Sequence, residues 1–284
     1  MRQIRTIFAV AGSLALAAAA ATSSYAANLQ VPSGFPTVQA AVNAAVDGDS
    51  VILAFLPFNE NVTVANKSIT ISGSGQKPNV LGINTSGSGT VTLNNLIIGG
   101  PGPGFSDTVV NVRGNTLTMT NCEVRSRLDA RDGGALNITS STFLGSPETE
   151  AVVVRNTPLV RLDRSLFVGG DGFAGQCGGN LLVNPKPGKP ALSFTNCPNI
   201  VVSNCIVEGG TSGVLDGIAG CGFALPISAP GGSAISLARG SDLTLQNSTV
   251  RKGEGSPEGR YINADITSAF SDEGPARSTA WMVE

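Results

Sequence analysis

One eight-residue pattern recurs along the chain and limits what the chain can fold into. Its clearest copy, residues 243–250, reads Leu-Thr-Leu-Gln-Asn-Ser-Thr-Val, with apolar side chains at its first, third and last positions. The fifth position of the aligned copies falls at residues 73, 95, 121, 140, 164, 204 and 247, so the steps are 22, 26, 19, 24, 40 and 43 residues. A short period with two long insertions predicts a stacked solenoid whose coils each contain three short strands.

A second apolar pattern precedes the first in each coil and supplies another strand. Its copies are Val110–Arg113, Leu128–Arg131, Val152–Arg155, Leu192–Thr195 and Ile235–Ala238. Because side chains alternate between the two faces of a strand, one aligned set from each pattern is predicted to stack inside the solenoid. The expected inward residues are Val112, Ala130, Val154, Phe194 and Leu237 on the first strand, and Leu93, Met119, Ile138, Leu162, Val202 and Leu245 on the second.

Asparagine recurs at the bend that follows the second strand. It occupies the fifth position of the pattern as Asn95, Asn121, Asn204 and Asn247, whereas Ser140 and Arg164 interrupt the series. Asn tolerates a left-handed backbone, and its amide can bond the same amide in the next coil. The sequence therefore predicts a partial asparagine ladder along one corner.

The two ends of the solenoid have different patterns. Residues 36–48 predict the one helix, because Val38, Val42 and Ala45 share a face, Thr37 can cap the start and Asp47-Gly48 can end it. We expect this helix to cover the open end of the first coil in a domain spanning residues 27–255, with about 7–9 coils. Residues 256–284 are expected to form either one more coil, with strands near 261–265 and 278–283, or a flexible tail.

Residues 1–26 have the pattern of a secretory signal peptide. Arg2 and Arg5 precede an apolar, Ala-rich run from Ile7 to Ala21, and Ser24-Tyr25-Ala26 resembles a cleavage site. We therefore expect a secreted or periplasmic monomer without a membrane span after cleavage. Removing both arginines from the 18 basic residues leaves 16, against 20 acidic ones, so the charge does not favour nucleic acid as a partner.

The N-terminal part resembles a known family. The segment Phe35–Ile52, followed by Asn59-Glu60-Asn61-Val62 and by residues 68–75, is similar to the opening of pectin methylesterases and related proteins. Together with the repeats, it resembles an all-β fold, the right-handed parallel β-helix of the pectin-lyase-like superfamily, over about residues 30–255. The resemblance implies a polysaccharide partner along the first-strand face.

The catalytic signatures of that superfamily are not found in this chain. The sequence has no histidine, and its single tryptophan is Trp281, so no catalytic motif transfers residue by residue. The absence of histidine also excludes Ser-His-Asp and Cys-His mechanisms and His-ligated metal sites. We expect neither a metal site nor another cofactor.

Three arginines occupy one outward position in successive coils. Arg113, Arg131 and Arg155 each follow the last inward residue of the first strand, so they are predicted to form a row with a spacing of ~4.8 Å. Such a row can bind carboxylate or sulfate groups, or it can be a solvated sheet face. Asp129 lies on the same face, as a partner of the arginines or as part of a catalytic set.

The two long insertions, residues 169–190 and 209–232, are expected to leave the same corner of neighbouring coils. Each contains one cysteine, and we predict a Cys177–Cys221 disulfide that ties them together beside the arginine row. Cys122 and Cys205 point into or along the stack and are too far apart to bond. Asp171 and Asp216 both precede Gly, which is typical of turns.

Three functions compete at this point. The leading hypothesis is a secreted protein that binds an extended, anionic polysaccharide through Arg113, Arg131 and Arg155. The second is a polysaccharide lyase acting by β-elimination, which needs a group that neutralises a carboxylate and a base. The third is a structural or adhesive surface protein without catalysis. Weak catalytic candidates for the lyase are Asp129, Arg155, Lys186 and Lys189.

Overall fold

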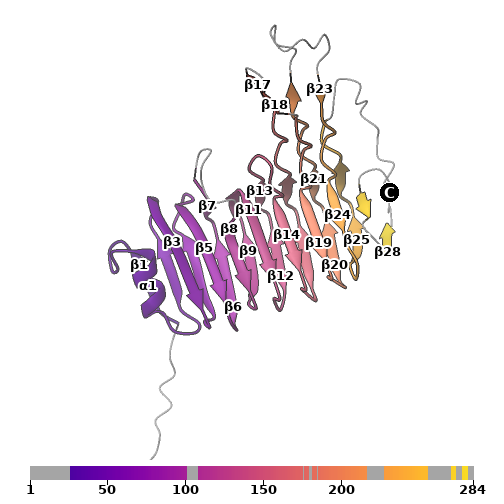
Figure 1. Cartoon of the computed structure of the whole chain (residues 1–284). Helices are drawn as coiled ribbons and strands as arrows, with labels where there is room; N and C mark the ends of the chain where they lie inside the picture. Colours follow the sequence, from indigo (N-terminus) through magenta and orange to yellow (C-terminus); the bar gives the residue numbers. More distant parts are fainter. Residues whose placement is uncertain are drawn as a thin grey trace, which may run out of the picture.

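The chain winds into a right-handed parallel β-helix (Figure 1). The structure is a computed structural model that describes residues 26–100, 108–174, 185–215 and 227–254, together with short strands at 176–178, 181–183, 270–272 and 277–280. A 10-stranded and a 14-stranded sheet, in which every pairing is parallel, form its walls. The solenoid and its three-strand coils were predicted from the spacing of the repeats, and this prediction is confirmed.

Each central coil contributes three strands to three stacks. The first strands are β8 (Thr108–Arg113), β11 (Arg127–Arg131), β14 (Val152–Arg155), β19 (Leu192–Thr195), β24 (Ile235–Leu237) and β27 (Phe270–Asp272). The second strands are β1 (Asn28–Val31), β2 (Ser50–Leu53), β4 (Ile69–Gly73), β6 (Thr90–Asn94), β9 (Thr116–Thr120), β12 (Leu136–Thr139), β15 (Val160–Asp163), β20 (Ile200–Ser203), β25 (Asp242–Gln246) and β28 (Arg277–Ala280). The third strands are β7 (Ile97–Ile98), β10 (Glu123–Arg125), β13 (Thr142–Leu144), β16 (Leu166–Val168), β21 (Ile206–Glu208) and β26 (Thr249–Arg251).

Two long strands near the N-terminus merge the first and third stacks. These are β3 (Pro57–Ala65) and β5 (Asn79–Ser86), and β5 pairs with β7 at its start and with β8 at its end. The first and third strands therefore belong to one sheet, whereas the second strands form the other.

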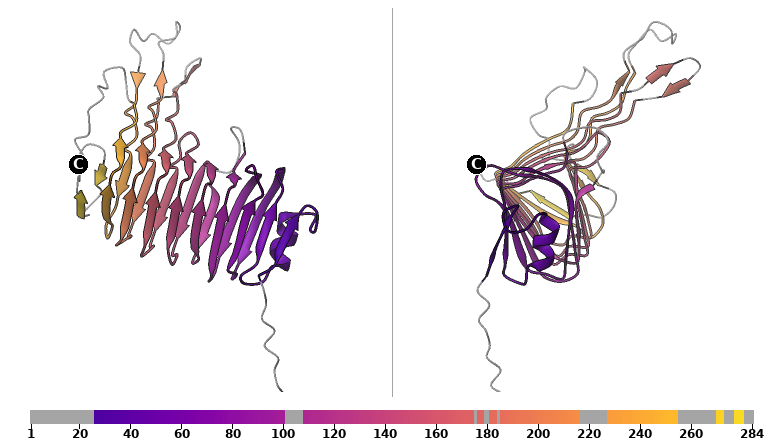
Figure 2. Two further views of the ribbon diagram at one scale, coloured as in Figure 1. Left: turned by 180° about the vertical axis from the view of Figure 1, so that it is seen from behind. Right: turned by 90° about the vertical axis from the view of Figure 1, so that its left-hand side faces the viewer.

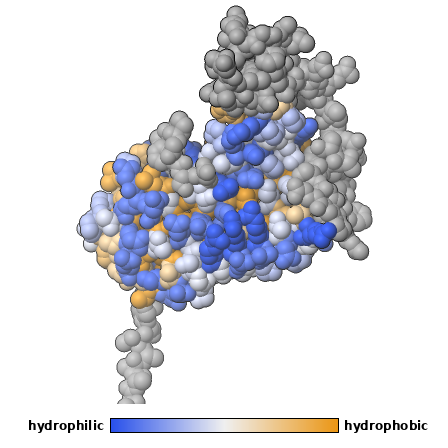
Figure 3. Space-filling model, in the orientation of Figure 1, coloured by the Kyte–Doolittle hydropathy of each residue, from blue (hydrophilic) through white to orange (hydrophobic). Residues whose placement is uncertain are grey.

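The interior is filled by the ladders that the alternation predicts. All the expected inward residues of the first and second strands are buried, except that Leu245, near the C-terminal end, is only partly buried against the core. The third strands add a ladder in which the rings of Phe143 and Phe167 stack with centroids 5.2 Å apart. Parallel register places each side chain above its equivalent, so the core extends through the whole stack. Hydrophilic residues cover much of the outer surface of the coils (Figure 3).

The bend after the second strand is left-handed in the central coils, as the Asn pattern indicates. Its residue has a positive φ, from 46° to 56°, at Asn95, Asn121, Ser140, Arg164, Asn204 and Asn247. The amide of Asn121 donates to the side chain of Asn95 at 3.0 Å, and the amide of Asn95 donates to the carbonyl of Gly75 at 2.8 Å. Ser140 and Arg164 break the ladder, although their backbone keeps the same conformation.

A second ladder, not predicted from the sequence, lies at the turn between the first and second strands. The amide of Asn156 donates to Asp132 at 2.8 Å, and the amide of Asn196 donates to Asn156 at 3.0 Å. All three residues have a positive φ. Both corners are therefore held by polar side chains that repeat with the coils.

Helix α1 (Val38–Ala44) covers the N-terminal end and is shorter than the predicted 36–48. Thr37 caps its start, as predicted, by accepting from the amide of Ala40 at 3.0 Å. The carboxylate of Glu60 accepts from the first two helical amides, and the ammonium of Lys67 donates to three carbonyls at the other end. Each of these partners lies about 22 residues from the helix residue that it binds, and the helix stops at Ala44, before the Asp47-Gly48 turn.

Serine and cysteine residues follow the left-handed bend, and the serine hydroxyls accept hydrogen bonds from the backbone of the preceding coil. The amides of Cys122, Ser141 and Cys205 donate to the hydroxyls of Ser141, Ser165 and Ser248 in the next coil. Cys122, Cys197 and Cys205 are buried and unbonded to one another, so these thiols are part of the core. The predicted Cys177–Cys221 disulfide involves side chains outside the described residues.

The C-terminal part continues the solenoid. Strand β27 pairs in parallel with β24, and β28 pairs in parallel with β25. The first strand of this coil is at 270–272, and the second begins at Arg277. Residues 261–265, where a strand was predicted, lie outside the described residues. Residues 1–25, including most of the predicted signal peptide, lie outside the described part. Among the residues that the structure does describe, no helix has the length and apolar character needed to cross a membrane.

Candidate functional site

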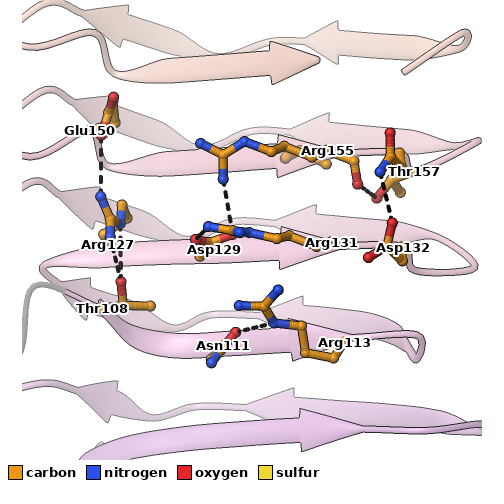
Figure 4. A network of polar contacts seen from close by, with 12 residues as sticks. Thr108, Asn111, Arg113, Arg127, Asp129, Arg131, Asp132, Glu150, Arg155 and Thr157 are labelled. Carbon is orange, nitrogen blue, oxygen red and sulfur yellow. Dashed lines mark hydrogen bonds and ion pairs between the residues drawn. The ribbon is translucent and has the colours of Figure 1, made fainter. Parts of the chain in front are cut away.

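The arginine row is present on the outward face of the first strands. Strand pairing places Arg131 directly beside Arg113 on one side and Arg155 on the other. Each arginine is the last residue of its strand, β8, β11 or β14, so the row lies next to the turn into the second strand. We call this row and its contacts the arginine face (Figure 4).

Asp129 lies beneath two of these arginines. Arg131 donates to both of its carboxylate oxygens, from Nε at 2.8 Å and from Nη2 at 2.6 Å, while Nη1 of Arg155 lies 3.6 Å away. The Asp129 side chain is only 5% exposed. Burial opposes its ionisation, but the hydrogen bond and charge of Arg131, with the charges of Arg155 and Arg127, prevail and hold the pKa of Asp129 below its usual value. Asp129 is therefore an ionised partner of the arginines.

Arg113 and Arg155 have fewer partners than Arg131. Nε of Arg113 donates to the neutral side chain of Asn111 at 3.0 Å, and Arg113 forms no ion pair with the described residues. Nη1 of Arg155 is buried beside Asp129, 3.6 Å away, but the Arg155 side chain as a whole is 40% exposed. The exposed donor groups of both arginines thus remain available to an anion.

A fourth arginine extends the face toward the start of the strands. Arg127 donates to the hydroxyl of Thr108 at 2.9 and 3.1 Å and lies 3.5 Å from the carboxylate of Glu150. The sequence could have revealed Arg127, because it alternates with Asp129 and Arg131 on one strand. Its partners could not be found in this way, since both belong to other coils.

The two insertions form a projection that we call the fin, consisting of residues 169–174, 185–190, 209–213 and 229–232. As predicted, both leave the solenoid directly after a third strand (Figure 2). Further out, β17 (Gln176–Gly178) pairs antiparallel with β18 (Leu181–Val183), and β22 (Val214–Leu215) with β23 (Ile227–Ser228). The fin arises at the start of the first strands, and the arginine row lies at their end, ~10 Å away for a four-residue strand.

Backbone hydrogen bonds between glycine-rich segments hold the fin together. The amide of Gly210 donates to the carbonyl of Lys189, and the amide of Gly232 donates to the carbonyl of Gly210. A Cβ on Gly210 would collide with the carbonyl oxygen of Gly170, and one on Gly188 would collide with that of Gly210. Glycine is therefore required for the segments to approach this closely.

The lysine candidates belong to the fin. Lys186 forms an ion pair with Glu148 at 2.9 Å and lies 5.8 Å from the ring centroid of Phe173. Lys189 contributes its backbone to the hydrogen bonds described above. Among the described residues, no contact joins either lysine to Asp129 or Arg155, so the catalytic candidates do not form one group.

Of the two aspartates that precede glycine in the insertions, Asp171 has structural contacts. The carboxylate of Asp171 accepts from the amide and hydroxyl of Thr211 at 2.9 and 2.6 Å, which joins neighbouring segments of the fin. Asp216 lies outside the described residues. Across the part of the chain that the structure describes, no group of three His, Cys, Asp or Glu side chains is placed to hold a metal ion.

Comparison with known proteins gives structural matches but no sequence match. No protein-family model matches the chain, and no curated protein matches its sequence. A structure of a mutant of AlyGC, a PL6-family alginate lyase, is similar with a TM-score of 0.40 and 15% identity, over 79% of this chain and 32% of that one. The A-module of the mannuronan C-5 epimerase AlgE4 from Azotobacter vinelandii matches with a TM-score of 0.25 and 11% identity, over 78% and 76% of the two chains. The present chain spans about a third of the lyase, and the function is argued below from its own residues.

Proposed function

We propose that this protein is exported and binds an extended, anionic polysaccharide along the arginine face. The observation that carries the proposal is the in-register row of Arg113, Arg131 and Arg155 on adjacent strands. Guanidinium groups bind carboxylate and sulfate through paired hydrogen bonds, and a row of them offers the same group at regular intervals.

The described contacts favour a binding face over a neutralised surface. The four arginines at 113, 127, 131 and 155 face two carboxylates in direct contact, Asp129 and Glu150, which leaves an excess of positive charge. Asp129 also holds the guanidinium of Arg131 in one orientation before a ligand arrives. Such preorganisation reduces the entropy that binding must overcome.

The direction of the arginine row favours a polymer as the ligand. The arginines follow one another across strands, along the axis of the solenoid, at the strand spacing of ~4.8 Å. A linear chain lying along that axis can engage all three, whereas a compact monosaccharide reaches fewer. Repeated contacts of this kind raise the affinity of a polymer over that of its units.

Calorimetry of the exported chain with polyuronates, sulfated glycans and neutral glycans tests the proposal. We expect binding to the anionic polymers, a weakening with salt, and about a hundredfold loss of affinity or more in the triple variant Arg113→Ala, Arg131→Ala, Arg155→Ala. Arg161→Ala is the matched control, because Arg161 is exposed on β15, in the other sheet. Equal binding by the triple variant and the parent would exclude the arginine face and favour an adhesive or structural role.

The same mixtures separate binding from cleavage. A lyase acting by β-elimination would release an unsaturated product that absorbs ultraviolet light, and binding alone would not. Asp129 is a poor base for such a reaction, because its carboxylate is buried and its pKa is lowered. We therefore expect stable complexes without product.

A further inference from the structure

The outward side of four neighbouring second strands is a regular array of uncharged polar side chains, which we call the hydroxyl face. Pairing of β4, β6, β9 and β12 places them in two rows. One row is Thr70, Thr92, Thr118 and Asn137, and the other is Ser72, Asn94, Thr120 and Thr139.

This array differs from the rest of the surface. The next strand, β15, places Arg161 and Asp163 at the equivalent positions. The first-strand stack carries the arginine face, and the third-strand stack carries Glu123, Arg125, Glu208 and Arg251. The hydroxyl face thus lacks charge over four coils, a pattern that strand propensity for Thr alone does not require.

The side chains of the hydroxyl face have no hydrogen-bond partner among the described residues of the protein. Within the described residues, none of the eight side chains forms a hydrogen bond or an ion pair with another side chain or with the backbone. Seven of them are half-buried and Asn94 is exposed. Their hydroxyl and amide groups therefore face solvent, while the β-branched threonines have few rotamers and hold their positions.

The spacing of the rows is fixed by the backbone. Equivalent side chains in adjacent strands are ~4.8 Å apart, and the two rows are ~6.7 Å apart because two residues separate them along each strand. Successive coils nearly superimpose when the solenoid is viewed along its axis, so the array is close to planar (Figure 2, right). Both repeats are near those of the oxygen rows on a prism face of hexagonal ice.

We propose that the hydroxyl face binds ice. Methyl groups of the threonines would order the neighbouring water, and the hydroxyls and amides would hydrogen-bond to it, so that a patch of lattice-like water joins the face to a growing crystal. The face has no charge to attract an ionic polymer and no aromatic ring on which a sugar could stack. This proposal is independent of glycan binding by the arginine face.

Thermal hysteresis and ice recrystallisation measurements on the exported chain test it. For the parent we expect a gap between the melting and freezing temperatures of ice, faceted crystals, and small ice grains after recrystallisation. All three effects should be lost in Thr92→Lys and Thr118→Lys. Thr142→Lys, on the outward side of β13 in the other sheet, is the matched control and should retain the activity. Arg113→Ala should retain it as well, which separates this property from the proposed function.

Several results would overturn the proposal. These are the absence of a gap for the folded parent at concentrations up to its solubility limit, or an unchanged gap in Thr118→Lys. If that variant unfolds, Thr118→Tyr replaces it in the same comparison, because its uncharged but bulky ring would break the flat array, and an unchanged gap in it would likewise overturn the proposal. Binding to crystalline cellulose that Thr118→Lys abolishes, without any hysteresis, would assign the face to a solid polymer instead of ice.

Discussion

Nη1 of Arg155 lies 3.6 Å from the carboxylate of Asp129 on the neighbouring strand, and Arg131 already binds both oxygens of that carboxylate. Asp129 is thus shared by two coils. The contact couples the orientation of the arginines to the stacking of β11 on β14. A group that serves a binding face in this way also contributes to stability, and the two roles can be measured separately.

Replacing Asp129 with Asn should destabilise the fold. The amide keeps the size of the side chain but leaves Arg131 and Arg155 without their counter-charge. Because both arginines are more than a third exposed, water screens part of the loss, and we expect about 1–2 kcal/mol in urea unfolding. Asp242→Asn is the control, since Asp242 is exposed on β25 and forms no described side-chain contact. Equal unfolding midpoints for both variants would contradict the structural role of Asp129.

Acid should weaken the fold through Asp49 and Asp129. Hydrogen bonds from the backbone at Val46 and Ala27 lower the pKa of Asp49, and the arginines lower that of Asp129 against the effect of burial. A carboxyl with a lower pKa in the folded state adds stability that is complete above its unfolded pKa, ~3.9, and is lost as the pH falls through the folded pKa. We therefore expect the urea midpoint to decline below about pH 4. Asp129→Asn should flatten this dependence, and an unchanged slope would argue against Asp129 as one of its sources.

The buried thiols should resist alkylation in the folded protein. Burial raises the pKa of the Cys205 thiol to about 11 and raises those of Cys122 and Cys197 as well. Since the thiolate is the reactive form, iodoacetamide at pH 8 should modify these residues slowly until urea unfolds the chain. Peptide mass mapping of native and unfolded samples measures this difference. Rapid modification of Cys205 in the native state would show that its coil opens readily.

The same mapping without reductant tests the Cys177–Cys221 disulfide. We expect one linked peptide pair that contains these two residues, because both insertions leave neighbouring coils at the same corner. The three buried cysteines should stay unlinked. Free thiols at residues 177 and 221 in a sample exported under oxidising conditions would disprove the pairing.

Alanine at Gly210 should disrupt the fin. Its Cβ would collide with the carbonyl oxygen of Gly170, which belongs to a backbone segment that cannot move aside alone. We expect faster proteolysis within the two insertions, residues 169–190 and 209–232, while the core of the solenoid keeps its free energy of unfolding within about 1 kcal/mol. Ser212→Ala, on the same segment, adds no atom and should leave the cleavage rate unchanged. Equal rates for both variants would mean that the fin does not depend on close backbone packing.

The sequence by itself determined the strands and bends of each coil. Each strand has an alternating pattern of apolar residues, and each bend has Asn, Ser or Arg at the same position. The period placed Val112, Ala130 and Val154 inside, and the same register placed Arg113, Arg131 and Arg155 in one outward row. These are properties of local backbone geometry, which repeats along the chain.

Contacts between coils were decided by the tertiary structure. Glu60 caps the start of helix α1 and Lys67 caps its end, each from about 22 residues away. Asp129 is buried beneath arginines of two strands, and glycine segments meet in the fin. Alternation shows which face a side chain occupies, but its burial and its partner depend on neighbouring coils and on their insertions. The two rows of the hydroxyl face follow from the aligned repeats, but the folded stack decides that their eight side chains point outward without a partner among the described residues.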